Sequence, residues 1–262
     1  MERVWRSGEE IAEALRLIEA GLDAGSVARR TRVPVATVRT WRRGDIPERA
    51  MLALLGVPAC ERCGWPAHRA DELPREAYAY LLGMYLGDGC LYAGARGVYA
   101  LRISLDAAYP GIIASTRDAI VAVRGGKLPH AARDKRTACV VITSYWKAWC
   151  CLLPQHGSGR KHQRPIRLTD WQRDIVAAAP EPFLRALIHT DGWRGLNRVR
   201  VKGRDYAYPR YQFSNRSDDI RALFTDVCDQ LGVAWRPWGP FHISVARRDA
   251  VAILDRFIGP KA

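Results

Sequence analysis

The sequence predicts an α+β protein in which one unit occurs twice, preceded by a small all-α domain. An apolar run of helix length that ends in Asp-Gly occurs at residues 81–89 and again at residues 184–192. Strand-like and helix-like patterns follow each run in the same order, whereas residues 1–57 show only helical periodicity. The simplest interpretation is a pair of αββαββα units with antiparallel sheets.

Composition limits the class of protein and of partner. The 262 residues, 48% of them hydrophobic, suffice for one large and one small domain with real cores. Lys and Arg number 41 against 27 Asp and Glu, and this excess of +14 indicates a polyanionic partner. No apolar run approaches the ~20 residues of a membrane span, and residues 1–6 lack the apolar region of a signal peptide. The seven cysteines do not form a secreted disulfide framework. We expect a cytoplasmic, nucleoid-associated protein with reduced thiols that binds nucleic acid and no membrane.

The first domain, residues 1–57, has helical patterns at residues 9–19, 26–31 and 35–43. The last two resemble the helix-turn-helix of bacterial regulators, with Ala28, Val33, Val38 and Trp41 as packing residues. Arg32 stands where that turn often has glycine. The outer face of the last helix carries donors suited to a major groove, namely Thr37, Arg39, Thr40, Arg42 and Arg43. The alternative is a generic helical hairpin with a solvated basic face.

The segment 58–74 is predicted to be a linker with a candidate zinc knuckle. Cys60 and Cys63, followed by Gly64, have the Cys-x2-Cys-Gly pattern in which two thiolates lie at a tight turn. The third ligand could be His68, His156 or His162, and no fourth is evident. Structural Zn2+ and free thiols therefore both remain open.

The two nine-residue runs predict a close helix pair. Each has small residues four apart, Gly83 and Gly87 in the first and Ala186 and Thr190 in the second, so that the two backbones can approach each other. Gly89 and Gly192 occupy the position where a left-handed residue often ends a helix. Asp88 and Asp191 then lie in last turns, where the helix dipole disfavours a carboxylate by roughly 0.3 to 1 kcal/mol. Two such acids brought together indicate a Mg2+ site; the alternative is a buried pair with ordinary Asp-Gly ends.

Each run is followed by a comparable series of elements. In the first repeat, residues 75–155, we expect strands at 99–105 and 139–144 and helices at 112–123 and 145–153. In the second repeat, residues 180–262, we expect strands at 208–214 and 241–245 and helices at 218–231 and 250–258. The basic segment 156–179 is predicted to link the repeats and to cross a phosphate backbone.

From residue 75 to the C-terminus, the chain resembles the LAGLIDADG homing endonucleases. Both runs match that signature at its apolar, small, final acidic and final glycine positions, and depart from it at Leu86 and His189, its first acidic position. The resemblance implies saddle-shaped sheets, each laid on one half-site of duplex DNA. Because both copies are in one chain, it also implies a pseudo-symmetric monomer that reads a long asymmetric site.

The resemblance further implies phosphodiester hydrolysis with divalent metal. Asp88 and Asp191, with the main-chain carbonyls of Gly87 and Thr190, would bind Mg2+ or Mn2+. The family often adds a lysine near the last strand of each unit, but those places hold Thr143 or Ser144 and Ala246 here. No spacing selects among the substitutes, which are Lys147, Lys161 and Lys202.

The expected DNA-binding residues of the repeats are basic and amide side chains on strands, turns and the linker. The main candidates are Arg102, Lys135, Arg136, Lys161, Arg198, Arg200, Lys202, Arg210, Gln212 and Asn215, with Arg96, Arg133, Arg194 and Arg204 beside them. About half of them are expected to be ordinary surface residues.

Two functions remain open. The first is a site-specific double-strand DNA endonuclease whose helix-turn-helix lengthens its footprint, which the two retained acids favour. The second is a transcriptional regulator derived from such a nuclease that binds DNA without cleavage, which the missing lysines and the fused helix-turn-helix favour. An RNA-splicing maturase is a third, smaller alternative.

Overall fold

The computed structural model describes residues 6–64, 70–134 and 137–259. The chain forms two compact units, residues 1–69 and residues 70–262. Within the described residues, no helix is long and apolar enough to cross a membrane.

The first unit is all-helical. It contains α1 (Gly8–Glu19), α2 (Ala24–Thr31), α3 (Val35–Arg42) and α4 (Glu48–Leu54). Ser7 and Glu10 form a capping box at the start of α1, and Asp23 caps α2. Val33, Val38 and Trp41 are buried as predicted, whereas Ala28 is only partly buried. Arg32 ends α2 with φ 56°, so this turn has the left-handed backbone that glycine would favour.

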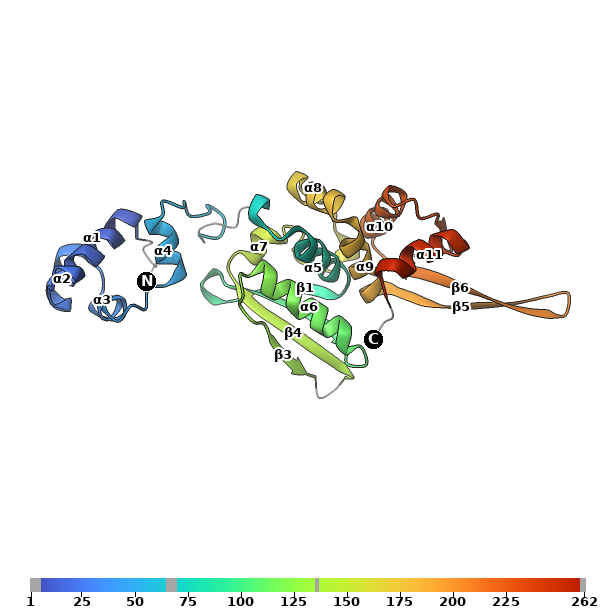
Figure 1. The fold of residues 1–262 in the computed structure, drawn as a ribbon, viewed down its shortest axis with the longest axis horizontal. Helices are drawn as coiled ribbons and strands as arrows, with labels where there is room; N and C mark the ends of the chain where they lie inside the picture. The colour runs from blue at the N-terminus through green and yellow to red at the C-terminus, as the bar shows by residue number, and fades with distance from the viewer. Residues whose placement is uncertain (1–5, 65–69, 135–136, 260–262) are drawn as a thin grey trace. The chain divides into compact units, whose positions relative to one another are not determined.

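The second unit is α+β and contains the predicted duplication (Figure 1). The first copy runs α5 (Arg75–Asp88), β1 (Gly89–Ala93), β2 (Tyr99–Asp106), α6 (Pro110–Val123), β3 (His130–Arg133), β4 (Cys139–Trp146) and α7 (Trp149–Leu152). The second runs α9 (Pro180–Asp191), β5 (Gly192–Val201), β6 (Arg204–Ser214), α10 (Asp218–Gln230), β7 (Arg236–Pro237), β8 (His242–Val245) and α11 (Arg248–Phe257). Both copies therefore have the predicted αββαββα order.

Each copy has one four-stranded antiparallel sheet. The strand orders are β1-β2-β4-β3 and β5-β6-β8-β7, and these are equivalent positions of the repeat. The α+β class and the duplication are thus confirmed. The helix predicted at 145–153 is wrong in its first part, because Tyr145 and Trp146 continue β4 and only Trp149–Leu152 is helical.

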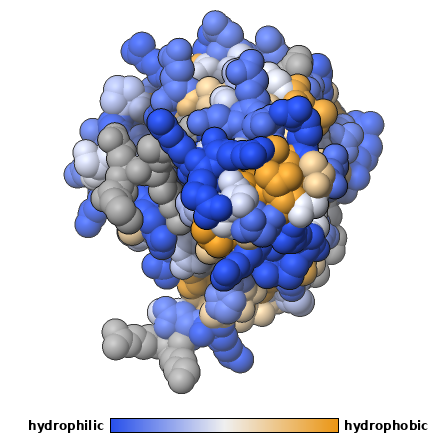
Figure 2. Space-filling view, turned by 90° about the vertical axis from the view of Figure 1, so that its left-hand side faces the viewer, coloured by the Kyte–Doolittle hydropathy of each residue, from blue (hydrophilic) through white to orange (hydrophobic). Residues whose placement is uncertain are grey.

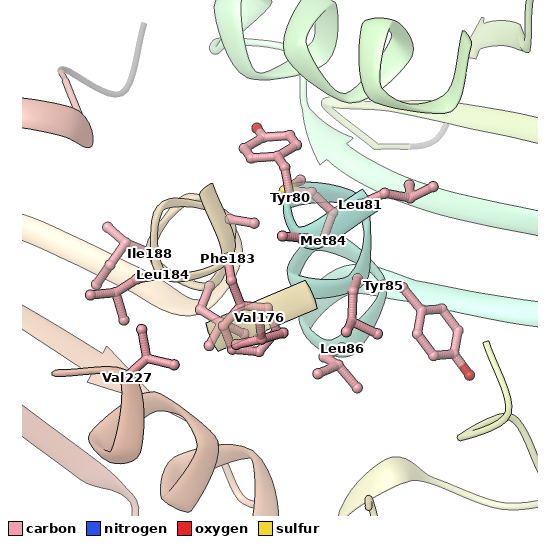
Figure 3. Packing of buried hydrophobic residues seen from close by; sticks show 14 of the residues in the cluster. Tyr80, Leu81, Met84, Tyr85, Leu86, Val176, Phe183, Leu184, Ile188 and Val227 are labelled. Atoms are coloured by element: carbon pink, nitrogen blue, oxygen red, sulfur yellow. The ribbon is translucent and has the colours of Figure 1, made fainter. Parts of the chain in front are cut away.

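The core of the second unit is built around α5 and α9. Residues 78–86 are all buried, which is why this helix is apolar on every side. Figure 3 shows Leu184 and Ile188 of α9 pointing toward Val227 of α10, while Tyr85 of α5 lies on the side away from α9. Between the repeats lie the short 3-10 turn η3 (Lys161–Gln163) and the helix α8 (Asp170–Ala178), which was not predicted.

Candidate nucleic-acid interface

The helices α5 and α9 meet along the small residues that the sequence singles out. A Cβ added to Gly83 would lie 2.6 Å from the Cβ of Ala186, and one added to Gly87 would lie 2.1 Å from Oγ1 of Thr190. Thr190 Oγ1 donates to the main-chain carbonyl of Ala186, 3.1 Å away, so it adds no unpaired polar group to the seam. The C-terminal ends of the two helices are therefore held side by side.

Asp88 and Asp191 are the last residues of α5 and α9, as predicted. The predicted left-handed conformation of Gly89 and Gly192 is wrong. Their φ values are −93° and −101°, in extended backbone that leads directly into β1 and β5. Glycine is needed there for a different reason: an added Cβ would lie 2.5 Å from the Cα of Tyr85 or 2.6 Å from the Cα of Ile188.

Lys161 contacts the end of α5, which the sequence did not predict. Its Nζ donates to the main-chain carbonyls of Tyr85, Leu86 and Gly87 at 2.6, 2.8 and 2.7 Å. Burial lowers the pKa of this ammonium to about 8, although the negative charges of Asp191 and Asp88 oppose the change. At neutral pH most of the group is still charged. Lys161, one of the three lysines considered as substitutes, thus has a charge that interacts with both acids.

The linker segment around Lys161 is folded by its own hydrogen bonds. Arg164 donates through Nη1 to the carbonyl of Gly159 at 2.6 Å and through Nη2 to that of Gln155 at 3.2 Å. The main-chain N–H of Gln163 donates to the carbonyl of Arg160 at 3.0 Å in η3. These hydrogen bonds position Lys161 against carbonyls that lie more than seventy residues earlier in the chain.

The second acid has a different partner. Asn215, directly after β6, donates from Nδ2 to Oδ2 of Asp191 at 2.7 Å. Its Oδ1 accepts the main-chain N–H of Ser217 at 2.8 Å. Asn215, predicted to bind DNA, therefore has both ends of its amide engaged within the protein.

The two positions that depart from the family signature have structural contacts. Leu86 is fully buried in the core. His189 Nδ1 lies 2.9 Å from the hydroxyl of Tyr80, which joins α9 to α5, and its Nε2 lies 3.3 Å from the carbonyl of Ile258. Neither position contributes an acid to the helix ends.

The implied metal ion fits the two helix ends differently. Carboxylate and carbonyl oxygens are the ligands that Mg2+ takes, and at the second repeat Asp191 and the Thr190 carbonyl are of this kind, with the neutral amide of Asn215 beside them. At the first repeat, the carbonyl of Gly87 accepts a hydrogen bond from an ammonium. The donor set therefore suits a divalent ion at the second repeat and not at the first.

One face of each sheet is not covered by the helices, and we call it the open face. Leu101, Ile103 and Leu105 of β2 are buried against the helices, so Arg102 and Ser104 lie on the open face, where they are exposed. The strand registers align one row of side chains across each open face. Each row begins two residues after the acid of its repeat, Asp88 or Asp191. The rows are Cys90, Arg102, Thr143 and His130 in the first sheet, and Trp193, Gln212, Ser244 and Arg236 in the second, with Thr143 and Ser244 buried between their neighbours.

Most of these row residues could not be found from the sequence. The strands β1, β3 and β7 have five, four and two residues, too short for a clear alternating pattern. The open faces also bring cations and aromatic rings together: Arg102 lies 5.5 Å from the ring centre of Tyr92, and Arg210 lies 5.8 Å from that of Trp238. Cations beside exposed aromatic rings are typical of surfaces that bind nucleic acid.

The strands β5 and β6 extend beyond their sheet as a two-stranded ribbon (Figure 1). β8 pairs with β6 only from Tyr211 to Ser214, whereas β5 pairs with β6 as far as Arg204. The ribbon ends in a two-residue turn, Lys202 and Gly203, both with positive φ. Tyr206 and Tyr208 stack on each other with ring centres 6.1 Å apart and remain partly exposed.

The strand register places the predicted DNA-binding residues of the second repeat on two opposite faces of the β5–β6 ladder. Arg210 and Gln212 lie on the open face, whereas Arg194, Arg198 and Arg200 share the opposite face of the ladder with buried Tyr211. Arg194 forms a bidentate ion pair with Asp255, with both N–O distances at 2.7 Å. This pairing favours a structural role for Arg194. Arg198, Arg200, Lys202 and Arg204 belong to the ribbon and are exposed. Lys135 and Arg136 lie outside the described residues.

The candidate recognition helix of the first unit is α3. Arg39 is exposed on it, whereas Thr40 donates to the carbonyl of Ala36 at 3.0 Å. Arg42 donates to the carbonyl of Leu22, and Arg43 lies 3.7 Å from Asp45 in an exposed ion pair. Figure 2 views the molecule from the side of the N-terminal unit in Figure 1 and shows a mainly hydrophilic surface with small hydrophobic patches.

Cys60 and Cys63 lie in the segment that follows α4. The main-chain N–H of Gly64 donates to the carbonyl of Cys60 at 2.7 Å, which forms the predicted tight turn. Both side chains are partly exposed. His68, one of the proposed additional ligands, lies outside the described residues.

Comparison with known proteins gives matches only at the level of structure. No protein-family model and no curated protein matches the chain. The structure of I-DmoI in complex with DNA and Mn is 13% identical, with coverage of 71% of this chain and 98% of that one and a TM-score of 0.47. The LAGLIDADG meganuclease I-AabMI bound to uncleaved DNA is 10% identical, with coverage of 69% and 83% and a TM-score of 0.46. The N-terminal LAGLIDADG domain of WhiA is 13% identical, with coverage of 78% and 94% and a TM-score of 0.41. The last two are LAGLIDADG proteins, the family that the paired runs resemble.

Proposed function

We propose that this chain is a sequence-specific double-stranded DNA-binding protein that acts as a monomer. The observation that carries the proposal is the pair of equivalent open faces, each with a row of mostly polar side chains across its four strands. Arginine and amide side chains on such a surface can reach both phosphates and base edges. Since the two rows differ at every position, the half-sites they read should differ too.

The charge of the chain supports a nucleic-acid partner. The sequence has a net charge of +14, and exposed arginines occur on the open faces, the ribbon and α3. Such a surface attracts a polyanion through its phosphates before any base is read. Duplex DNA, with its regular array of phosphates, fits this distribution of charge.

The N-terminal unit is proposed to add a second DNA contact. The helices α2 and α3 have the lengths and the short connection of a helix-turn-helix, and Arg39 is exposed on the second of them. Because Arg42 donates to the Leu22 carbonyl, fewer residues of α3 are proposed to contact DNA than the sequence suggests.

Two more specific functions are possible for such a DNA-binding protein, and one observation favours each of them. Retention of Asp88 and Asp191 at adjoining helix ends favours a metal-dependent endonuclease. When bound, Mg2+ or Mn2+ supplies an activated water and stabilises the leaving oxygen. The Lys161 ammonium on the Gly87 carbonyl favours the alternative, a transcriptional regulator that binds DNA without cleaving it.

A cleavage assay separates these two functions. DNA containing the selected binding site is incubated with the full chain and Mg2+ or Mn2+, and the products of each strand are resolved. Under the nuclease proposal, Asp191→Asn abolishes cleavage, because Asp191 lies at the helix end whose donors suit a divalent ion. Both Asp88→Asn and Asp191→Asn change DNA affinity only a few-fold, because neither acid is expected to bind DNA. A loss of affinity on the order of 100-fold in both variants would contradict the assignment of the site.

We propose that Cys60 and Cys63 bind a structural zinc ion. Two thiolates at a tight turn are half of a structural site. Measurement of zinc content in the purified full chain and in Cys60→Ala tests it: the wild type should contain zinc and the variant should contain none.

A further inference from the structure

The contacts of Lys161 place a built-in cation at the C-terminal end of α5. An ammonium has three N–H donors, and the three carbonyls of Tyr85, Leu86 and Gly87 use all of them at 2.6 to 2.8 Å. The Nζ also lies 5.3 Å from the ring centre of Tyr85, within the range of a cation–π contact. The side chain is therefore held from several directions.

The end of α5 requires positive charge. Its last carbonyls have no partner within the helix and are the negative end of the helix dipole. Asp88 adds a carboxylate at this end, and the seam between Gly87 and Thr190 brings the end of α9, with Asp191, close to it. Both acids interact favourably with the ammonium, Asp191 more strongly than Asp88.

The end of the second central helix has a different donor. Asn215, a neutral amide, donates to Asp191 there. Because Lys161 comes from the linker between the repeats, which occurs once in the chain, its hydrogen bonds can serve only one of the two helix ends. The two helix ends thus differ in their hydrogen-bond donors, although the charge of the ammonium acts on both acids.

We propose that the Lys161 ammonium takes the place of a divalent ion in the first repeat, so that the acid pair binds at most one divalent ion, at Asp191. This inference rests on the proposed function only in that the acid pair belongs to a DNA-binding surface. A chain of this kind has metal chemistry available for one strand at most. It does not have the two ions that double-strand cleavage by two equivalent acids would use.

The mechanism of exclusion is direct competition. A divalent ion that binds the Gly87 carbonyl must displace an ammonium with three short hydrogen bonds, or accept a positive charge next to it. The folded linker opposes displacement, since Arg164 holds it through the carbonyls of Gln155 and Gly159. Removal of the ammonium should therefore open the site to metal.

Thermal unfolding of full-length variants tests this at the first repeat alone. Asp191→Asn removes the second acid, and Lys161→Met is then added, followed by Asp88→Asn. The melting temperature of each protein is measured in EDTA and in Mn2+. An ion that binds only the native state at about ten times its dissociation constant should raise the melting temperature by roughly 3 to 6 °C.

We expect Mn2+ to leave the Asp191→Asn protein unchanged and to raise the melting temperature once Lys161→Met is added. The rise should disappear when Asp88→Asn is added as well. An Asp88-dependent rise with Lys161 still present would overturn the inference, as would the absence of any rise after Lys161→Met. If Lys161→Met does not fold, Lys161→Gln provides a second variant that removes the charge but keeps N–H donors.

Two controls keep the result specific. Arg167→Met removes the same charge from an exposed side chain of the linker and should not create a response to Mn2+. DNA binding is measured on the same proteins in EDTA. If they bind DNA but the metal response differs from expectation, only this inference fails; if the wild type binds no DNA, the proposed function fails.

Discussion

Gly83 and Gly87 determine how closely the two central helices approach. At Gly83 an added methyl group would meet the Cβ of Ala186 at 2.6 Å and the carbonyl of Phe183 at 2.8 Å. Because α5 is buried on every side, it cannot shift without disturbing the core. The closeness of the two acids at the helix ends depends on these small residues.

A swap of side chains across the seam tests this contact. Gly83→Ala should destabilise the protein by about 1 to 3 kcal/mol, because it overpacks the seam. Adding Ala186→Gly should recover part of this loss, since the methyl group is then carried by the other helix. The free energy of unfolding is measured by urea titration, with Gly157→Ala in the linker as a control that meets only ordinary contacts. Additive effects of Gly83→Ala and Ala186→Gly would show that the two residues do not touch.

For these central residues, the sequence predicted their identity but not all of their contacts. The spacing of small residues and the final acids was enough to place Gly83, Gly87, Asp88 and Asp191. The contact of Lys161 with the end of α5 spans more than seventy residues of sequence, and no local pattern encodes it. The glycine after Asp88 was correctly expected at the helix end, but steric closeness to the preceding turn and not a left-handed backbone explains it.

The sequence predicted best those helices and strands that bury one face along most of their length. The strands β2 and β4, with eight residues each, gave a recognisable strand pattern, and the amphipathic α10 and α11 gave a helical one. The edge strands β1, β3 and β7 are short, and β5 carries polar side chains on much of its length, so their patterns are weak. These strands were expected because the αββαββα order includes them, and not because their own residues show a strand pattern.

The β5–β6 ribbon is the element whose contribution to DNA binding can be isolated. Its exposed basic residues are Arg198, Arg200, Lys202 and Arg204. Replacing residues 197–208 by Asn-Gly should leave the sheet intact, because β8 pairs with β6 only beyond this segment. DNA affinity should fall, and the log-log slope of affinity against salt should decrease by about 0.9 for each phosphate that the shortened protein no longer neutralises.

The matched control is substitution of Tyr206 and Tyr208 by Thr, which keeps the ribbon and its charge. If the shortened protein has the wild-type salt slope, the ribbon does not touch the phosphates. If the Tyr variants lose as much affinity as the shortened protein and both keep the wild-type salt slope, the stacked rings bind the DNA and the cations do not.

For the molecule as a whole, the two compact units should contribute separate parts of one footprint. Deletion of residues 1–69 removes the first unit entirely. Protection from hydroxyl radicals should then shorten at one end of the site only, because the two sheets remain to cover the rest. The salt slope should fall as well, since α3 no longer neutralises phosphates. An unchanged footprint would mean that the helix-turn-helix does not bind DNA.

The two different open faces of one chain should together read one asymmetric DNA site. Selection of duplexes from a random library by the full chain, followed by affinity measurement at fixed salt, tests this without any assumption about cleavage. We predict a single asymmetric sequence bound at least about 1,000-fold more tightly than random duplex, and as a complex with one protein chain. Selected duplexes that bind no more tightly than random DNA would contradict this reading of the two faces, and so would a palindromic site occupied by two chains.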